Sequence, residues 1–132
     1  MAGNGMRLAA VRVFVSDIAG AVDFYRDQLG LQPEAVSLDD GYAVFPLANG
    51  ADLIVEADAP EEDGEEGLVG RFVGASLAVD DIEEAYQSLS EQGVRFADPP
   101  ERQPWGGWLA HFMDPDDNVL SLVQLPEADP AV

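Results

Sequence analysis

The chain repeats one order of predicted elements, a strand, a helix and then further strands, on either side of an acidic segment. Apolar side chains alternate along residues 8–15, as they do in a half-buried strand, and this alternation returns along residues 72–79. The helix boundaries repeat as well, with an aspartate before each helix and a glycine after it: Asp17 and Gly30, then Asp81 and Gly93. Two copies predict a pair of βαβββ modules, because a solenoid needs at least three repeats.

A β-hairpin is predicted at the end of the second copy. Residues 108–113 and 119–124 are rich in aromatic, valine and leucine side chains, which are typical of strands. The segment between them, Asp114-Pro115-Asp116-Asp117-Asn118, consists of residues that favour a tight turn. The hairpin is therefore expected to close the second module.

The first copy contains a similar hairpin, in which residues 41–47 and 52–57 flank the turn dipeptide Asn49-Gly50. The two helices align at an offset of 64 residues, since Asp17 matches Asp81. The hairpins align without gaps at an offset of 66, which matches Tyr42 with Trp108, Leu53 with Val119 and Val55 with Ser121.

Length and composition indicate one globular domain. The chain has 132 residues, 47% of them hydrophobic, which is enough for a packed core. We expect module one at 7–57, an acidic linker at 58–70 and module two at 71–125.

Cysteine is absent, which excludes disulfides and thiolate metal sites. No apolar run is long enough to span a membrane, and residues 1–7 lack the apolar core of a signal peptide, so we expect a cytoplasmic protein without a membrane partner.

The charge is strongly negative. The 26 acidic residues outnumber six arginines, lysine is absent, and the net charge is −20. Such a chain repels phosphate backbones, so nucleic acid is excluded as a partner. The acidity has two explanations: adaptation to a very salty cytoplasm (a halophilic protein), or an acidic surface that binds a protein partner. We favour the first, because the acidic residues are spread along the chain.

Several short segments resemble those of the vicinal oxygen chelate superfamily, which includes glyoxalase I, extradiol dioxygenases and bleomycin-resistance proteins. They are Val15-Ser16-Asp17 with Phe24-Tyr25 and Leu29-Gly30-Leu31, then Val79-Asp80-Asp81-Ile82 with Gly93-Val94, and finally Pro104-Trp105-Gly106 before the last hairpin. The turn at 114–118 is similar to the Asp-Pro-Asp-Gly-Asn turn of that family, with Asp117 in place of the glycine. The resemblance implies an α+β fold, two tandem βαβββ modules forming a curved sheet around a cavity with helices outside, and a homodimer.

Metal-dependent members of the superfamily hold the ion with four His, Glu or Gln side chains. The resemblance places these ligand positions at Ala10, Val55, Gly74 and Ser121, where no carboxylate or imidazole is found. A divalent ion needs several oxygen or nitrogen ligands, so no metal and no other cofactor is expected. Glu56 is one residue out of register, and strand alternation would turn it away from the cavity.

Two polar residues are candidates for function. His111 is a weak catalytic candidate because the imidazole pKa lies near neutrality, although a single histidine in an apolar strand also suits a packed core position. Arg12 shares the strand face of Ala10 and needs a partner there, which is either an internal carboxylate or an anionic or carbonyl ligand. The predicted ligand-binding set combines these two residues with aromatic walls and one hydroxyl: Arg12, Phe14, Tyr42, Trp105, Trp108, His111 and Ser121.

The sequence thus favours a metal-free protein that binds a small organic molecule, as bleomycin-resistance-like proteins do. Two alternatives stay open: a glyoxalase- or dioxygenase-like enzyme (a lyase, isomerase or oxidoreductase) with displaced metal ligands, and a protein-interaction module.

The charge leads to a prediction about stability. Screening shortens the reach of charge repulsion from about 10 Å at 0.1 M salt to about 3 Å at 1 M, so a chain of net charge −20 should become more stable as salt is added. Thermal melts in low and molar potassium chloride measure this effect. A melting temperature that stays flat or falls would contradict the salt-adaptation explanation.

Overall fold

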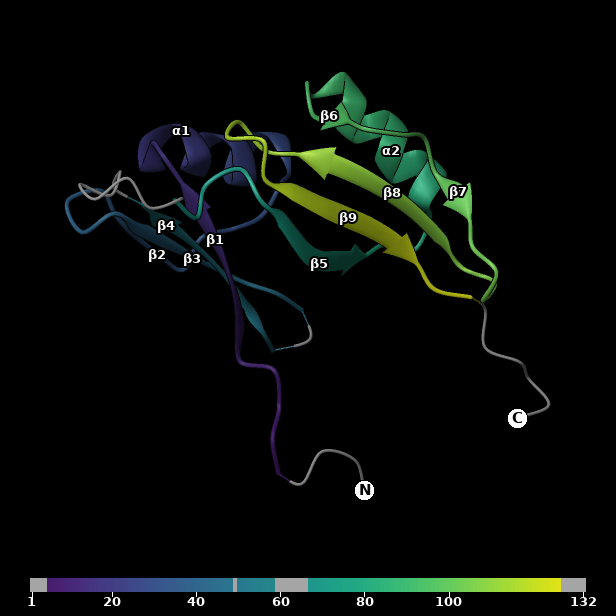
Figure 1. Cartoon of the computed structure of the whole chain (residues 1–132), viewed down its shortest axis with the longest axis horizontal. Coiled ribbons are helices and arrows are strands. Elements are labelled where there is room, and N and C mark those ends of the chain that lie inside the picture. The colour runs from purple at the N-terminus through teal and green to yellow at the C-terminus, as the bar shows by residue number, and fades with distance from the viewer. Residues whose placement is uncertain (1–4, 49, 59–66, 127–132) are drawn as a thin grey trace. The chain divides into compact units, whose positions relative to one another are not determined.

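The computed structural model describes residues 5–48, 50–58 and 67–126 (Figure 1). The chain divides into two compact units, Met1–Val69 (unit 1) and Gly70–Val132 (unit 2). Most of the expected linker, residues 59–66, and Asn49 of the first predicted turn lie outside the described residues. Within those ranges, no helix has both the length and the apolar character that crossing a membrane requires.

Unit 1 has the element order of one βαβββ module. Its elements are β1 (Ala10–Val15), α1 (Ile18–Asp23), the π-helical turn η1 (Phe24–Gln28), β2 (Ala35–Ser37), β3 (Tyr42–Pro46) and β4 (Asp52–Ala57). The strands form a sheet in the order β1-β4-β3-β2, with β1 parallel to β4 and the other neighbours antiparallel.

The helical segment of unit 1 packs on one face of this sheet. Val13 and its neighbour Val55 on β4 are fully buried there, as is Phe45 on β3. Tyr25 packs against Phe45 with ring centroids 6.0 Å apart. The helix widens to a π turn at Phe24, whose carbonyl accepts from Leu29 N at 2.9 Å. Phe24 and Tyr25 are adjacent in the chain, and both are buried at this widened turn.

Unit 2 repeats the order and adds one short strand. Its elements are β5 (Phe72–Ala78), α2 (Ile82–Glu91), β6 (Arg95–Phe96), β7 (Glu101–Arg102), β8 (Trp108–Met113) and β9 (Val119–Gln124). The sheet order is β5-β9-β8-β6, β7 also pairs with β8, and α2 contacts β8 and β9 (Figure 1). The predicted α+β fold is confirmed, and the predicted bounds of the last two strands are those observed.

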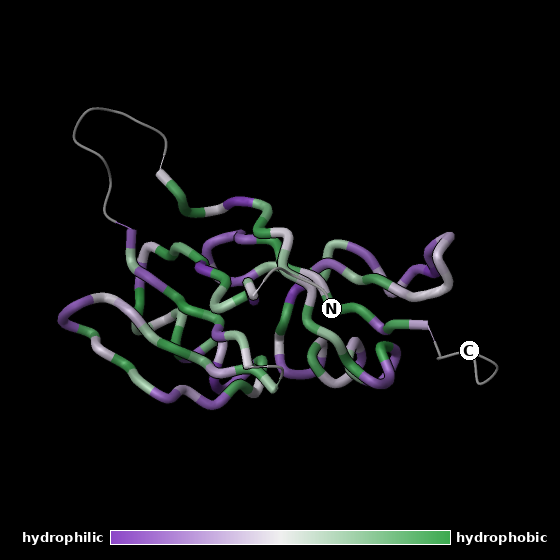
Figure 2. Tube along the Cα trace, turned by 90° about the horizontal axis from the view of Figure 1, so that it is seen from below, coloured by the Kyte–Doolittle hydropathy of each residue, from purple (hydrophilic) through white to green (hydrophobic). Residues whose placement is uncertain are grey.

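Alternation along β8 and β9 separates two faces of the second sheet. Ala110 and Phe112 on β8 and Leu120 and Leu122 on β9 are buried on one face, where Ile82 of α2 is also buried. Short alternating stretches of apolar and polar residues are visible along the trace (Figure 2). The burial of apolar side chains on this face stabilises unit 2.

The predicted helix boundaries are confirmed, but the caps differ in detail. Asp81 accepts from Glu84 N at 3.2 Å as an N-cap residue does, whereas Asp17 occupies the N-cap position without a side-chain bond. Gln124 of β9 supplies a further cap, because its Oε1 accepts from Ile82 N at 2.8 Å. Both expected glycines adopt left-handed conformations, with φ of +87° at Gly30 and +95° at Gly93.

The predicted hairpin offset of 66 residues was wrong, and the observed offset is 67. Pro46 pairs with Asp52 at the end of the first hairpin, and Met113 pairs with Val119 at the end of the second. Both turns contain five residues and the same backbone bonds, from Leu47 N to Ala51 O and from Asp114 N to Asn118 O. The positive-φ residues, Gly50 and Asp117, also match at this offset.

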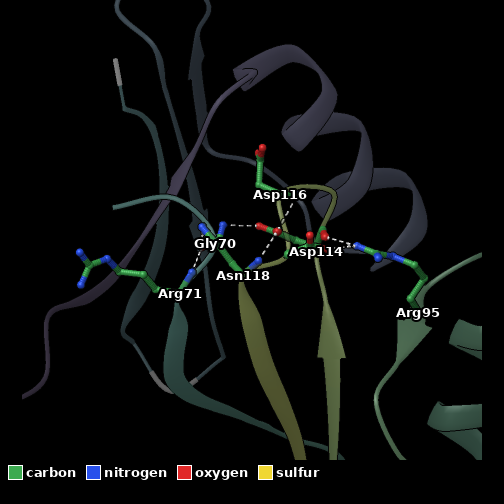
Figure 3. Close-up of polar contacts among 7 residues, drawn as sticks. Gly70, Arg71, Arg95, Asp114, Asp116 and Asn118 are labelled. Carbon is green, nitrogen blue, oxygen red and sulfur yellow. Dashed lines mark hydrogen bonds and ion pairs between the residues drawn. The ribbon is translucent and has the colours of Figure 1, made fainter. Parts of the chain in front are cut away.

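A buried polar cluster holds the second turn (Figure 3). Asp114 Oδ1 accepts from the backbone N of Asp116 and of Asn118, and its Oδ2 accepts from Asn118 Nδ2, all at 2.9 Å. Asn118 Oδ1 in turn accepts from Gly70 N at 2.8 Å and Arg71 N at 3.1 Å. Both side chains are almost fully buried, so these bonds compensate the loss of water.

Arg95 joins the same cluster from the start of β6. Its NH2 group donates to Asp114 O and to Asp117 Oδ1, each at 2.8 Å. Asp117, which takes the place of glycine in the turn that the resemblance suggests, adopts φ of +66°, a conformation that aspartate tolerates better than most residues. The turn thus ties three segments of unit 2 together: the start of β5, the start of β6 and the β8–β9 hairpin.

Exchanging the two buried groups tests this cluster. Asp114→Asn sets its amide nitrogen against Asn118 Nδ2, two donors facing one another, and we expect a loss of about 1–3 kcal/mol in unfolding free energy. Asn118→Asp sets two buried carboxylates together and should cost at least as much. The double variant restores a donor facing an acceptor and should recover most of the loss. Urea unfolding of all four proteins measures the coupling, and additive losses would contradict the assigned network.

Candidate functional site

Each sheet has a face opposite its helix, and most of the predicted site residues lie on these two faces. We call them the distal faces. In unit 1 the distal face carries Arg12 and Phe14 of β1, and it also carries Glu56 and Tyr42, which pair with one another across β4 and β3. In unit 2 it carries His111 and Ser121, a cross-strand pair of β8 and β9.

An ion pair dominates the distal face of unit 1. Arg12 Nε donates to Glu56 Oε2 at 2.6 Å, and the guanidinium carbon lies 5.1 Å from the centre of the Phe14 ring. The hydrogen bond to Glu56, and then its negative charge, raise the pKa of Arg12. The Arg12 side chain stays 59% exposed, so the pair contributes little to stability and leaves the guanidinium within reach of a ligand.

The strand faces predicted for Glu56 and Val55 were wrong. Glu56 shares the face of Arg12, whereas Val55 pairs with Val13 on the buried face under α1. The one-residue error in the hairpin offset is the cause, because a shift of one residue reverses every face of a strand. At the observed offset Ser121 corresponds to Ile54, and Val55 corresponds to Leu122.

The distal face of unit 2 carries the only histidine of the chain, and Asp98 holds it in place. Asp98 accepts from the backbone N of His111 at 3.0 Å through Oδ1, and its Oδ2 lies 3.3 Å from His111 Nδ1. The Phe72 ring lies 6.4 Å from the imidazole, centre to centre. Ser121 lies directly across from His111 and pairs with Ser76 of β5 on its other side.

The two tryptophans are not brought together with His111. Trp108 lies on the opposite face of β8, because it is an odd number of residues away from His111. Trp105 lies in the loop before β8 and is 50% exposed. Its ring covers Gly107, where an added Cβ would lie 1.9 Å from Cζ3 of Trp105. Gly107 therefore matters for the position of Trp105, which the sequence did not indicate.

The residues at which the resemblance places metal ligands offer few groups that could bind a metal ion. Ala10 and Gly74 offer no side-chain donor, and Ser121 offers one hydroxyl. Gly74 also adopts φ of +78° at an irregularity in the β5–β9 pairing, a conformation that is strained for an imidazole- or carboxylate-bearing residue. Among the described residues, no three or more His, Cys, Asp or Glu side chains are grouped so that they could hold a metal.

Asp98 is the residue that sequence reasoning missed. It lies 13 positions before His111 in the chain, in the segment between β6 and β7. Nothing in the periodicity distinguishes it from the other acidic residues. The contact can be inferred only once the strand pairing is known. Ala97 N donates to His111 O, and this bond brings the neighbouring Asp98 alongside the imidazole.

Comparisons with known proteins agree with this architecture. A sequence model of the Glyoxalase/Bleomycin resistance protein/Dioxygenase superfamily matches residues 7–122. A solved member of that superfamily from Sphaerobacter thermophilus is 35% identical, with a TM-score of 0.72 over 91% of this chain and 98% of that one. TnmS3, described as an antibiotic binding protein from a Streptomyces species, is 32% identical, with a TM-score of 0.70 over 96% and 99% of the two chains.

A curated relative extends the comparison. The bleomycin resistance protein of Geobacillus stearothermophilus is 27% identical over 123 residues, which cover 83% of this chain and 90% of the relative. The family model, the shared βαβββ order and these similarities give one result: the chain belongs to the Glyoxalase/Bleomycin resistance protein/Dioxygenase superfamily.

Proposed function

We propose that this protein binds a small organic molecule without a metal and acts by sequestering it. The observation that carries the proposal is the chemistry of the family's ligand positions, where Ala10 and Gly74 offer no donor and Ser121 only a hydroxyl. Similarity to a bleomycin resistance protein and to an antibiotic binding protein supports the same function. Hydrogen bonds and aromatic contacts replace metal coordination as the means of recognition.

The distal face of unit 1 supplies one set of ligand contacts. Only Nε of Arg12 is bonded to Glu56, so the two terminal nitrogens can donate to a carbonyl or anionic group of the ligand. Phe14 lies beside the guanidinium, and Tyr42 lies across from Glu56 with 36% of its surface exposed. A polar group flanked by flat apolar surfaces suits an amphipathic small molecule.

The proposal predicts that the purified protein holds no stoichiometric transition metal. Elemental analysis after exposure to zinc, nickel, manganese and iron should find far less than one equivalent per chain, because too few donors converge. Glu56→Ala and His111→Ala serve as controls. A tightly held equivalent that either substitution removes would contradict the metal-free proposal.

Arginine substitution tests the ligand contact. A hydrogen bond from a charged donor contributes about 1.5–3 kcal/mol, so Arg12→Ala should weaken an anionic or carbonyl ligand roughly ten- to a hundred-fold. Arg26→Ala is the matched control, because Arg26 is also exposed and ion-paired, with Asp23 and Asp27, but lies on η1. Tryptophan fluorescence can follow titrations with glycopeptide antibiotics, aromatic acids and 2-oxoaldehyde–thiol adducts. Equal affinities of wild-type protein and Arg12→Ala would show that Arg12 is structural.

One observation favours an enzyme as the second candidate. His111 beside Asp98 is an imidazole oriented by a carboxylate, which is an arrangement that general bases use. Turnover of the same compounds should therefore be assayed alongside binding. Turnover that His111→Gln abolishes, in protein free of metal, would favour the enzyme.

We also propose that the protein is cytoplasmic and forms a homodimer. The dimer is what its resemblance to the family implies. Light scattering at low and high salt measures the mass in solution. The mass of a single chain under both conditions would contradict the dimer.

A further inference from the structure

We propose that the distal face of unit 2 binds aromatic molecules that carry a hydroxyl group, with His111 Nε2 accepting the hydroxyl proton and Phe72 packing against the ring. This inference rests on the proposed small-molecule binding and specifies its ligand chemistry. It depends on a separate set of residues from the Arg12 contact, so each can be tested without the other.

The carboxylate of Asp98 determines which imidazole nitrogen carries the proton. An ionised carboxylate can only accept hydrogen bonds, and Oδ2 lies 3.3 Å from His111 Nδ1 while Oδ1 accepts from His111 N. The neutral imidazole therefore holds its proton on Nδ1. Its Nε2 is left with a lone pair and functions as an acceptor. Asp98 Oδ2 holds the ring at Nδ1 and Oδ1 holds the His111 backbone N, so this acceptor is fixed in direction before a ligand arrives.

Phe72 offers an apolar surface beside this acceptor. Phe72 is 66% exposed, and its ring lies 6.4 Å from the imidazole, centre to centre, and is tilted by 47° to it. The ring extends along β5 over Gly74, where an added Cβ would lie 3.6 Å from Phe72 Cε2, in ordinary van der Waals contact. An exposed phenylalanine next to a fixed acceptor suits a flat aromatic ligand, because aromatic pairs add to the apolar burial.

The accessible part of this face lies at His111 and Ser76. Ser76 has a short, exposed side chain, whereas Ser121 between them is covered by its neighbours and keeps 3% of its surface. His111 keeps 32% of its side-chain surface exposed and Asp98 keeps 40%. A ligand that only accepts hydrogen bonds would meet the lone pair of Nε2 unfavourably, so the face should discriminate between a hydroxyl and an ether of the same shape.

The first test reads the tautomer directly. The chain has one histidine, so the imidazole nitrogens of a ¹⁵N-labelled sample give an unambiguous two-bond proton–nitrogen NMR spectrum. At a pH where this spectrum shows a neutral ring, we expect the proton on Nδ1. In Asp98→Asn the amide oxygen accepts from His111 N and the amide nitrogen then faces Nδ1, so the proton should move to Nε2. A proton on Nε2 in the wild-type protein would overturn the proposal.

The second test uses a matched pair of probes, 2-naphthol and 2-methoxynaphthalene. Wild-type protein should bind the naphthol roughly three- to ten-fold more tightly, the range expected for one neutral hydrogen bond. Asp98→Asn should abolish or reverse this preference, because Nε2 becomes a donor. Phe72→Leu should weaken both probes and keep their ratio. Arg12→Ala should leave the ratio unchanged.

The outcomes separate this inference from the proposed function. Equal affinity for the two probes in the wild-type protein, or failure of both to bind, would overturn the hydroxyl-aromatic site, whereas binding of other ligands through Arg12 would still support sequestration. A preference that persists in Asp98→Asn would also overturn it. A naphthol preference that disappears in Asp98→Asn, with the proton moved to Nε2, supports it.

Discussion

The buried carboxylate of Asp114 is the interaction on which the order of unit 2 depends. It cannot stay ionised away from water without donors, and the turn supplies them from its own backbone and from Asn118. Asn118 Oδ1 then accepts from the backbone N of Gly70 and of Arg71. Those bonds bring the start of β5 to the start of β9, where Val119 N donates to Arg71 O at 2.9 Å. One local requirement for donors thus fixes a pairing between strands far apart in the chain.

The same pairing decides which side chains share a face. Once β9 is held between β5 and β8, strand alternation puts His111, Ser121 and Ser76 on the distal face and Phe112 with Leu120 on the other. The first turn repeats the backbone bonds with Leu47 and Ala51 in place of Asp114 and Asn118. A buried carboxylate is therefore not required for this turn geometry. The contribution of the polar cluster in unit 2 is the link between the turn and the start of β5.

Sequence reasoning predicted the elements well and the register of β4 wrongly, for a physical reason. The strands β8 and β9, the aspartates before the helices and the glycines after them all carry local signals, namely composition, capping and positive φ. The register of β4 does not, because Leu53, Ile54 and Val55 are all apolar and alternation cannot distinguish their two faces. The misplaced Val55 and Glu56 follow from this run. The Asp98–His111 contact was equally hidden, since it depends on the pairing of β8 with a segment that has no periodicity.

On both distal faces, side chains that could ligate a metal are paired with other side chains. A metal ion needs several ligand atoms that converge on one point. Here a carboxylate oxygen of Glu56 is bonded to Arg12, and His111 Nδ1 faces Asp98. Arg12 and His111 each keep hydrogen-bonding capacity after this pairing. Arg12 keeps its terminal nitrogens as donors, and His111 keeps Nε2 as an acceptor, each next to a phenylalanine ring. In a chain of net charge −20, the Arg12 guanidinium can offer directional hydrogen bonds while Glu56 compensates its charge. The two distal faces therefore present hydrogen-bonding groups beside aromatic rings.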